Sequence, residues 1–191
     1  MLQVDFSTFP TLETVRLILR QLNEHDVAAL HRLRSHEQTM KYICRPLSTC
    51  EQDAREFLDQ LKDAQTNGMG ITWCLSTRAA PTILIGIIGL YRINKGNFRG
   101  EVGYTLQPDY WGQGFMSEAL QGVLKFSFAN LGFHSLEAHA DPRNERSTTL
   151  LKRNCFRLAG TLRDCIFFEG SFYSSAVYEL LNSEWKLQQS L

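Results

Sequence analysis

The stretch from Glu101 to Leu120 constrains the fold more than any other part of this 191-residue chain. Its first part alternates apolar and polar side chains with the two-residue period of a half-buried β-strand. Pro108 cannot donate a hydrogen bond to a strand ladder, so this strand should end near Gln107. From Met116 the apolar residues follow the period of a helix. The stretch therefore predicts a strand, a tight loop and a helix in close succession.

Two glycines, Gly112 and Gly114, lie in the loop between this strand and this helix. Glycine lets the backbone turn its N–H groups outward, and here these groups lie at the positive end of the helix dipole. Such a loop is suited to an anion, above all a phosphate. A simple turn without a ligand and a dinucleotide-binding loop are both alternatives. The second needs repeated strand–helix–strand units, whereas several predicted strands of this chain follow one another directly.

Composition and charge argue against several classes of protein. Twenty basic and twenty acidic residues cancel, which gives no general attraction to nucleic acid or to an anionic membrane. The longest apolar run, residues 83–90, is too short to span a bilayer, and the first six residues lack the pattern of a signal peptide. Five cysteines without a Cys-x-x-Cys pair favour free thiols in a reducing compartment. We therefore expect a cytoplasmic protein without a metal ion.

The remaining patterns predict a single α+β domain over residues 1–191, with its core from about residue 13 to residue 185. Strands are predicted at Val15–Leu19, Ile71–Ser76, Ile83–Arg92, Glu101–Gln107, His134–Ala140, Arg157–Arg163 and Tyr173–Leu181. Helices are predicted around Val27–Leu33, between Thr49 and Asn67, at Met116–Leu131 and at Asn144–Arg153. This order gives a three-layer structure with a mixed, mostly antiparallel sheet of about six to seven strands and about four helices. One parallel crossover runs through the glycine loop.

Seven short motifs resemble, in their order and spacing, the GNAT N-acetyltransferase superfamily, and more narrowly the RimJ/RimL type, which includes ribosomal-protein-alanine N-acetyltransferases. The motifs are Thr14–Arg20, Glu101–Tyr104, Tyr110–Leu120, Asn144–Ser147, Leu151–Phe156, Gly160–Arg163 and Glu184–Trp185. Each motif alone is a weak signal, and together they cover nearly the whole chain. The resemblance implies the GNAT fold, with a sheet splayed at its centre, and an acetyl-CoA-dependent N-acetyltransferase.

The chain departs from the family pattern at five positions. Trp111 and Met116 stand where the superfamily's loop pattern begins with Gln or Arg and ends with Gly or Ala. Cys155 and Ser174 stand in place of the usual glycine and aspartate. Leu151 occupies the position of the tyrosine that many members use as an acid. The cofactor contacts implied by the resemblance are mostly made by backbone groups, which tolerate such changes.

The resemblance implies a site for acetyl-CoA as a cosubstrate. Backbone N–H groups of the loop and of the first helical turn would hold the pyrophosphate. Leu106 would pair its backbone with the pantetheine arm, and Asn144 would bond to that arm with its amide. The implied cofactor-binding residues are Leu106, Trp111, Gly112, Gln113, Gly114, Phe115, Met116, Ser117 and Asn144. The strands that contain Glu101 and His134 would splay apart to admit the arm.

Acetyl transfer needs a base that neutralises the acceptor amine. Glu101 is the first candidate, because it shares a strand face with Gly103, where a missing side chain leaves room for an amine. A glutamate is a weak base, since its ordinary pKa is about 4.3. The alternative role for Glu101 is an edge charge paired with Arg92 or Arg99.

Three further residues are catalytic candidates. Two of them are His134 and His139, because histidine is the residue type whose ordinary pKa is nearest to neutral, although a strand histidine is commonly a packing residue. Ser147 matches the serine of the RimL-type subgroup and could donate a hydrogen bond to the departing sulfur. Its alternative role is capping within the first turn of its helix.

The chemistry of amines favours one class of acceptor. An α-amine, with an ordinary pKa of about 7.7–8.0, is about one-tenth neutral at pH 7, whereas lysine, near 10.4, is almost wholly charged. A weak base is therefore better matched to a protein or peptide N-terminus. The alternatives are a small amine such as a polyamine, amino acid or aminoglycoside, and a non-catalytic acyl-CoA-binding regulatory module. The aromatic run within Cys165–Ser175 could be core, substrate groove or dimer contact, so a monomer and a homodimer both stay open.

Overall fold

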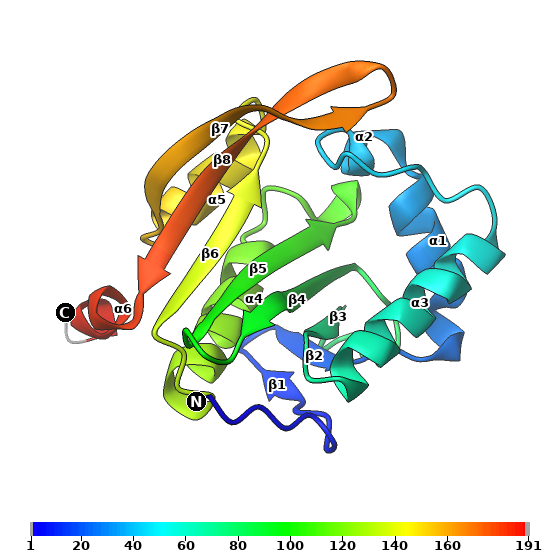
Figure 1. The fold of residues 1–191 in the computed structure, drawn as a ribbon. Helices are drawn as coiled ribbons and strands as arrows, with labels where there is room; N and C mark the ends of the chain where they lie inside the picture. Colours follow the sequence, from blue (N-terminus) through cyan, green and yellow to red (C-terminus); the bar gives the residue numbers. More distant parts are fainter. Residues whose placement is uncertain (1, 190–191) are drawn as a thin grey trace.

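The computed structural model describes residues 2–189 and contains one eight-stranded sheet with the order β1-β2-β3-β4-β5-β6-β8-β7 (Figure 1). The strands are β1 (Leu12–Glu13), β2 (Leu17–Gln21), β3 (Ile71–Thr77), β4 (Gly86–Asn94), β5 (Arg99–Leu106), β6 (Ser135–Ala140), β7 (Arg157–Phe168) and β8 (Ser171–Leu181). Neighbouring strands are antiparallel, except that β5 and β6 are parallel. The α+β class and the parallel crossover are confirmed, and the sheet has eight strands rather than six or seven.

Six α-helices lie in the described part of the chain, rather than about four. They are α1 (Val27–Ser35), α2 (Glu37–Met40), α3 (Glu51–Thr66), α4 (Phe115–Lys125), α5 (Glu145–Arg153) and α6 (Asn182–Gln189). In Figure 1, α4 and α5 lie behind the sheet, while α1 and α3 pack together beside β3 and β4.

The side-chain alternation of the strands divides the core into two layers. Trp73 and Leu75 of β3 belong to the layer that α4 covers, whereas Cys74 between them belongs to the layer under α1 and α3. Helix α4 buries one stripe of side chains at helical spacing, formed by Met116, Ala119, Leu120, Val123 and Leu124. The sheet is therefore buried on both faces over β3 and β4.

Several boundaries differ from the sequence predictions because local turns override the apolar pattern. Strand β2 begins at Leu17 rather than Val15, which is 87% exposed. Strand β4 begins at Gly86, because the N–H of Ile83 closes a turn on the carbonyl of Ala80. The helix predicted to reach Leu131 ends as α4 and continues as a π-helical turn over Phe126–Asn130. The short elements β1 and α2, and the C-terminal α6, were not predicted.

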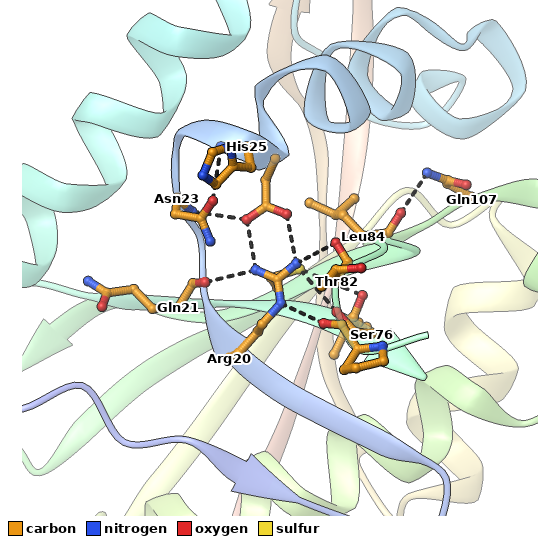
Figure 2. A network of polar contacts seen from close by, with 12 residues as sticks. Arg20, Gln21, Asn23, His25, Ser76, Thr82, Leu84 and Gln107 are labelled. Atoms are coloured by element: carbon orange, nitrogen blue, oxygen red, sulfur yellow. Dashed lines mark hydrogen bonds and ion pairs between the residues drawn. The ribbon is translucent and has the colours of Figure 1, made fainter. Parts of the chain in front are cut away.

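A buried ion pair holds the start of α1 on the sheet. Two guanidinium nitrogens of Arg20 donate to the Asp26 carboxylate at 2.7 and 2.8 Å, and the Asp26 side chain is 3% exposed. Figure 2 shows that Arg20 also donates to the backbone carbonyls of Gln21 and Thr82. Asn23 and Asp26 form the capping box of the 3-10 turn at Glu24–Asp26.

The sheet opens at its centre, between β5 and β6. The two strands pair only from Arg99 to Glu101, opposite Ser135 to Glu137. Strand β6 then follows β8 as far as Ala140, so the second half of β5 has no strand beside it on that side. The splayed centre implied by the family resemblance is therefore present.

Two further expectations can be compared with the structure. All five cysteines are free thiols. Within residues 2–189, no helix combines the length and the apolar character that crossing a bilayer requires.

Candidate active site

The gap beside β5 exposes backbone hydrogen-bonding groups. The N–H of Gln107 donates to the carbonyl of Ile85, which immediately precedes β4. Because strand residues alternate in the side to which their backbone groups point, Tyr104 and Leu106 direct theirs away from β4 and into the gap. The gap is part of a cleft of about 1100 Å³, lined by the second half of β5, the end of β6, the glycine loop and α5. An extended ligand with amide groups could pair with β5 there, as a strand would.

The glycine loop presents a helix N-terminus without a side-chain cap to this cleft. Gly112 and Gly114 have φ values of +74° and +80°, in the left-handed region that favours glycine. Gly114 is the N-cap of α4 and supplies no side chain to the free N–H groups of the first turn. Phe115, Met116 and Ser117 belong to that turn and line the cleft. The loop therefore has the geometry of an anion site.

A brace from the N-terminal part of the chain holds this loop. Thr14 Oγ1 and the backbone N–H of Arg16 both donate to Glu118 Oε1, at 2.6 and 2.7 Å. The Arg16 guanidinium donates to Glu118 Oε2 at 2.6 Å and to the carbonyl of Gln113 at 3.0 Å. It also lies 4.4 Å from the centre of the Phe115 ring. These contacts lower the pKa of the Glu118 carboxyl against the opposing effect of burial. The sequence motif Thr14–Arg20 thus sets the position of the glycine loop.

The start of α5 lies across the cleft from β5. Asn144 caps this helix by accepting from the N–H of Ser147 at 3.2 Å. The Ser147 hydroxyl lies 2.9 Å from the Tyr104 hydroxyl. Burial raises the pKa of Tyr104 to about 12, while the hydrogen bond between Tyr104 and Ser147 opposes the shift. This phenol is therefore protonated at neutral pH and can donate to Ser147, whose own proton is then free for a ligand.

Cationic side chains rim the same cleft. Arg146 lies over the Trp111 ring, 4.3 Å from its centre, and Arg153 lies about two helical turns further along α5. The indole N–H of Trp111 donates to the carbonyl of Leu106 at 2.8 Å. Trp111 thereby links the glycine loop, β5 and α5.

Glu101 lies on the other face of β5 from the Tyr104 side chain. Its carboxylate forms an ion pair with Arg92 at 2.9 Å and its side chain is 16% exposed. Arg99 pairs instead with Glu137, at 2.6 Å. Gly103 leaves room mainly for a neighbour, because a Cβ there would lie 3.1 Å from the Tyr91 ring.

A second acid and a histidine lie beside Glu101. One ligand atom from each of Glu101, Glu137 and His139 lies within 4.8 Å of the other two. This spacing would suit a metal ion or an ammonium group. The His139 side chain lines the cleft, and its Nε2 is 3.8 Å from Glu137 Oε1. Two faces of different character thus meet at the opening of the sheet: the N–H donors of the anion cradle behind it, and the carboxylate and imidazole acceptors of the cluster in front.

Comparison with known proteins identifies the family. Residues 16–157 match the acetyltransferase (GNAT) domain. This chain belongs to the GNAT acetyltransferase family. It is 31% identical over 173 residues to the uncharacterized N-acetyltransferase YoaA of Bacillus subtilis, a match that covers 91% of this chain and 97% of YoaA. It is therefore an acetyltransferase.

Two other GNAT proteins are similar in sequence or structure. The ribosomal protein uS5-alanine N-acetyltransferase of Escherichia coli is 26% identical over 103 residues, which is 53% of each chain. The structure of RimL, a ribosomal L7/L12 α-N-protein acetyltransferase in complex with coenzyme A, superposes with a TM-score of 0.82 at 20% identity. That match covers 92% of this chain and 99% of RimL, and it shows that the two share the GNAT fold.

The structure brings most of the sequence-predicted site residues of this GNAT protein together. Ser147 lines the cleft with Leu106, Trp111, Gly112, Gly114, Phe115, Met116, Ser117 and Asn144. Gln113 is outside the lining, because its carbonyl accepts from Arg16 and its side-chain amide donates to Asp109. His134 is also outside it.

Two contacts at the site are not indicated by any sequence pattern: the one between Tyr104 and Ser147 and the one between Arg16 and Glu118. Tyr104 was assigned only to the alternation of its strand, and its contact with Ser147 joins residues 43 positions apart. The brace between Arg16 and Glu118 spans 102 positions. The signal that could identify the contact between Tyr104 and Ser147 is the presence of an aromatic hydroxyl in the strand that precedes the glycine loop.

Proposed function

We propose that this GNAT protein transfers the acetyl group of acetyl-CoA to a primary amine, and that the amine is the α-amine of a protein or peptide N-terminus. The observation that supports this most is the junction of an uncapped helix N-terminus with an open strand edge in one cleft. The first suits a pyrophosphate and the second suits an amide-containing chain. These are the two chemical features of the arm of coenzyme A.

The residues present fit this cosubstrate. Gly114 leaves the first N–H groups of α4 without a side-chain cap, and Arg146 and Arg153 bring positive charge to the rim. Met116 is buried in the α4 stripe, with 8% of its surface exposed, so its bulk lies mostly away from the phosphate position. In our proposal, Leu106 and Asn144 hold the pantetheine arm, and residues 111–117 hold the pyrophosphate.

The reaction is a direct attack of the amine on the thioester carbonyl. Ser147, supported by the Tyr104 hydroxyl, lies on the cofactor side of the gap and is placed to donate a hydrogen bond to the departing sulfur. Glu101 lies on the opposite side, where the acceptor would approach. Its carboxylate attracts the ammonium form of the acceptor and orients it toward the gap.

A small cationic amine is the second candidate acceptor, and one observation favours it. Glu101, Glu137 and Glu179 are register partners across β5, β6 and β8, so their side chains share one face of the sheet. A row of carboxylates suits a polyamine better than it suits a single α-amine.

The free cysteines fit a reducing compartment, and we propose a cytoplasmic enzyme.

A panel of acceptors tests the proposal. Purified protein with acetyl-CoA is given peptides that begin with alanine or serine, spermidine, free amino acids and an aminoglycoside, and thiol release is measured. We expect turnover with the peptides that is faster than with spermidine, and lower turnover in Ser147→Ala. Absence of coenzyme A binding at micromolar concentration would refute the scheme. Binding of coenzyme A without turnover of any amine would favour the regulatory module.

A further inference from the structure

We propose that His139 is the general base of this acetyl transfer and that Glu101 and Glu137 hold the acceptor ammonium beside it. The proposal rests on the acetyltransferase reaction proposed above. The proton of the acceptor amine passes to a histidine on β6, across the gap from β5. The first candidate from the sequence is instead Glu101 on β5.

His139 lies where the two central strands separate. Glu101 and Glu137 are the last partners of the β5–β6 ladder, and His139 follows Glu137 by two residues, so both side chains point to the same face. The His139 side chain is 28% exposed and lines the cleft. Gly103, at the corresponding distance along β5, places no side chain in front of it. An acceptor that approaches from this face therefore meets the imidazole at the opening through which a thioester would be reached.

The three groups have a spacing that an ammonium ion can bridge. Atoms that lie within 4.8 Å of one another all lie within about 2.8 Å of a common centre, which is the length of a charge-assisted hydrogen bond. A primary ammonium has three N–H donors, and the cluster offers three acceptors. Each donor can thus find its own partner.

The neighbouring charges leave the cluster able to accept a cation. Arg99 occupies Glu137 Oε2, so Oε1 faces His139. Arg92 pairs with Glu101 from β4. From β8, Ser175 contacts the imidazole and Glu179 lies opposite Glu137. Arg157 of β7, the register partner of Glu179, forms an ion pair with Glu184. Four carboxylates therefore face three guanidinium groups, and one negative charge remains for the incoming ammonium.

The contact of His139 Nδ1 with Ser175 determines which ring nitrogen of the imidazole carries a proton. His139 Nδ1 lies 3.2 Å from the hydroxyl of Ser175, a residue that is only 5% exposed. If Nδ1–H donates to this hydroxyl, Nε2 carries the lone pair and points toward the carboxylates. Once Nε2 takes a proton, Glu137 Oε1 stabilises the imidazolium across 3.8 Å. Ser175 is then a positioning residue for the base.

The proton and electron pairs balance without another reactant. One N–H bond of the bound ammonium breaks and an Nε2–H bond forms, which leaves a lone pair on the amine nitrogen. That pair forms the C–N bond while the carbonyl π pair moves to oxygen. The π bond re-forms as the C–S bond breaks, and the departing thiolate takes the second nitrogen proton, assisted by Ser147. The imidazolium returns its proton to solvent.

The first experiment compares His139→Gln with His134→Gln, which changes a histidine of the same segment that lies outside the cleft. Acetylation of an alanine-initiated peptide is measured from pH 6 to pH 9. In His139→Gln we expect kcat to fall about 100-fold at pH 7, because general-base catalysis typically contributes this much. The deficit should shrink toward pH 9, where an α-amine is itself mostly neutral. The KM for acetyl-CoA should not change, and His134→Gln should match the unchanged protein.

Equal activity and an equal pH profile in His139→Gln would overturn the proposal. If this variant does not fold, Ser175→Ala and Ser175→Thr replace it. The alanine variant should lose about tenfold in kcat and lose the Nδ1–H tautomer in imidazole ¹⁵N spectra, and threonine should restore both. Unchanged tautomer and rate in Ser175→Ala would also overturn it.

A binding measurement separates this proposal from the proposed function. The imidazole resonance absent from His139→Gln is followed as the peptide is added to the full chain without acetyl-CoA. A shift that disappears in Glu137→Gln supports the ammonium site even if no turnover is found. Turnover without any such shift would leave the acetyltransferase function in place and refute the role of His139.

Discussion

At the scale of single residues, the contact between Tyr104 and Ser147 supports the most direct prediction. Tyr104→Phe removes one hydroxyl that is 2.9 Å from Ser147 and leaves the ring in place. We expect kcat to fall about tenfold with little change in the KM for acetyl-CoA, since in the proposed mechanism the Tyr104–Ser147 pair stabilises the sulfur only as charge develops on it. Steady-state kinetics of the two proteins measures this. A change confined to KM would place Tyr104 in cofactor binding instead.

The same residue predicts how stability responds to alkaline pH. Burial raises the pKa of Tyr104 from its ordinary value of 10.0 to about 12. The folded state therefore holds its proton more tightly than the unfolded state, so this contribution is present below pH 10 and is lost as pH rises toward 12. We expect the free energy of unfolding to fall less steeply over this window in Tyr104→Phe. Chemical denaturation at several pH values, with matched ionic strength, provides the comparison.

Cys155 is strained by its backbone. It has a φ of +64° and follows Asn154, the C-cap of α5. The N–H of Phe156 bonds to the carbonyl of Leu151, and that of Cys155 to Lys152. This pattern is a Schellman motif, which favours glycine at the Cys155 position. Cys155→Gly should stabilise the protein by about 0.5–1 kcal/mol. Cys155→Ala, which keeps the Cβ, should give no gain; equal gains in both would mean that the thiol rather than the backbone is responsible.

At the scale of elements, the brace joins Thr14 and Arg16, which precede β2, to Glu118 of α4 and holds the glycine loop. Arg16 makes a forked contact with Glu118 and Gln113 that lysine cannot reproduce. We expect Arg16→Lys to weaken coenzyme A binding about tenfold, and Arg55→Lys to leave it unchanged. Arg55 of α3 pairs with Glu24 away from the loop and the brace, and it is a suitable control. Isothermal calorimetry gives both constants, and equal affinities would show that the loop holds its shape without the brace.

In the hairpin of β7 and β8, the run of aromatic residues within Cys165–Ser175 does not by itself indicate whether its side chains are buried. Phe167 and Phe172 stack on each other with ring centres 5.0 Å apart, and they are 65% and 63% exposed. The aromatic run therefore is not core at these two positions. A substrate groove and a dimer contact stay open for it.

At the scale of the whole molecule, the split sheet predicts a pattern of hydrogen exchange. The N–H groups of Tyr104 and Leu106 point into the gap, whereas those of Thr105 and Gln107 point toward β4. Without a ligand, we expect the first two to exchange rapidly and the second two slowly. Coenzyme A should protect Tyr104 and Leu106 selectively. Uniform protection along β5 would indicate general stabilisation rather than pairing with the gap.

Much of this architecture was predictable because its signals are local. The period change at Met116 and the helix that starts near Asn144 each depend on residues close in the chain. The other features depend on contacts between residues that are far apart in the sequence. Tyr104 and Ser147, like His139 and Ser175, meet only once the sheet has assembled, so no short pattern reveals them. The bounds of β1, with two residues, fall below what periodicity can resolve.

The brace on the glycine loop also has a consequence for how the protein matures. Thr14 and Arg16 leave the ribosome about a hundred residues before Glu118, their partner across 104 and 102 positions. Contacts between such distant segments form late, because a long loop must close first. A nascent or truncated chain that lacks α4 would have no cradle, however well its first strands pair. The proposed phosphate site therefore forms only once α4 has been synthesised and has packed on the sheet. We expect unfinished chains not to bind acetyl-CoA.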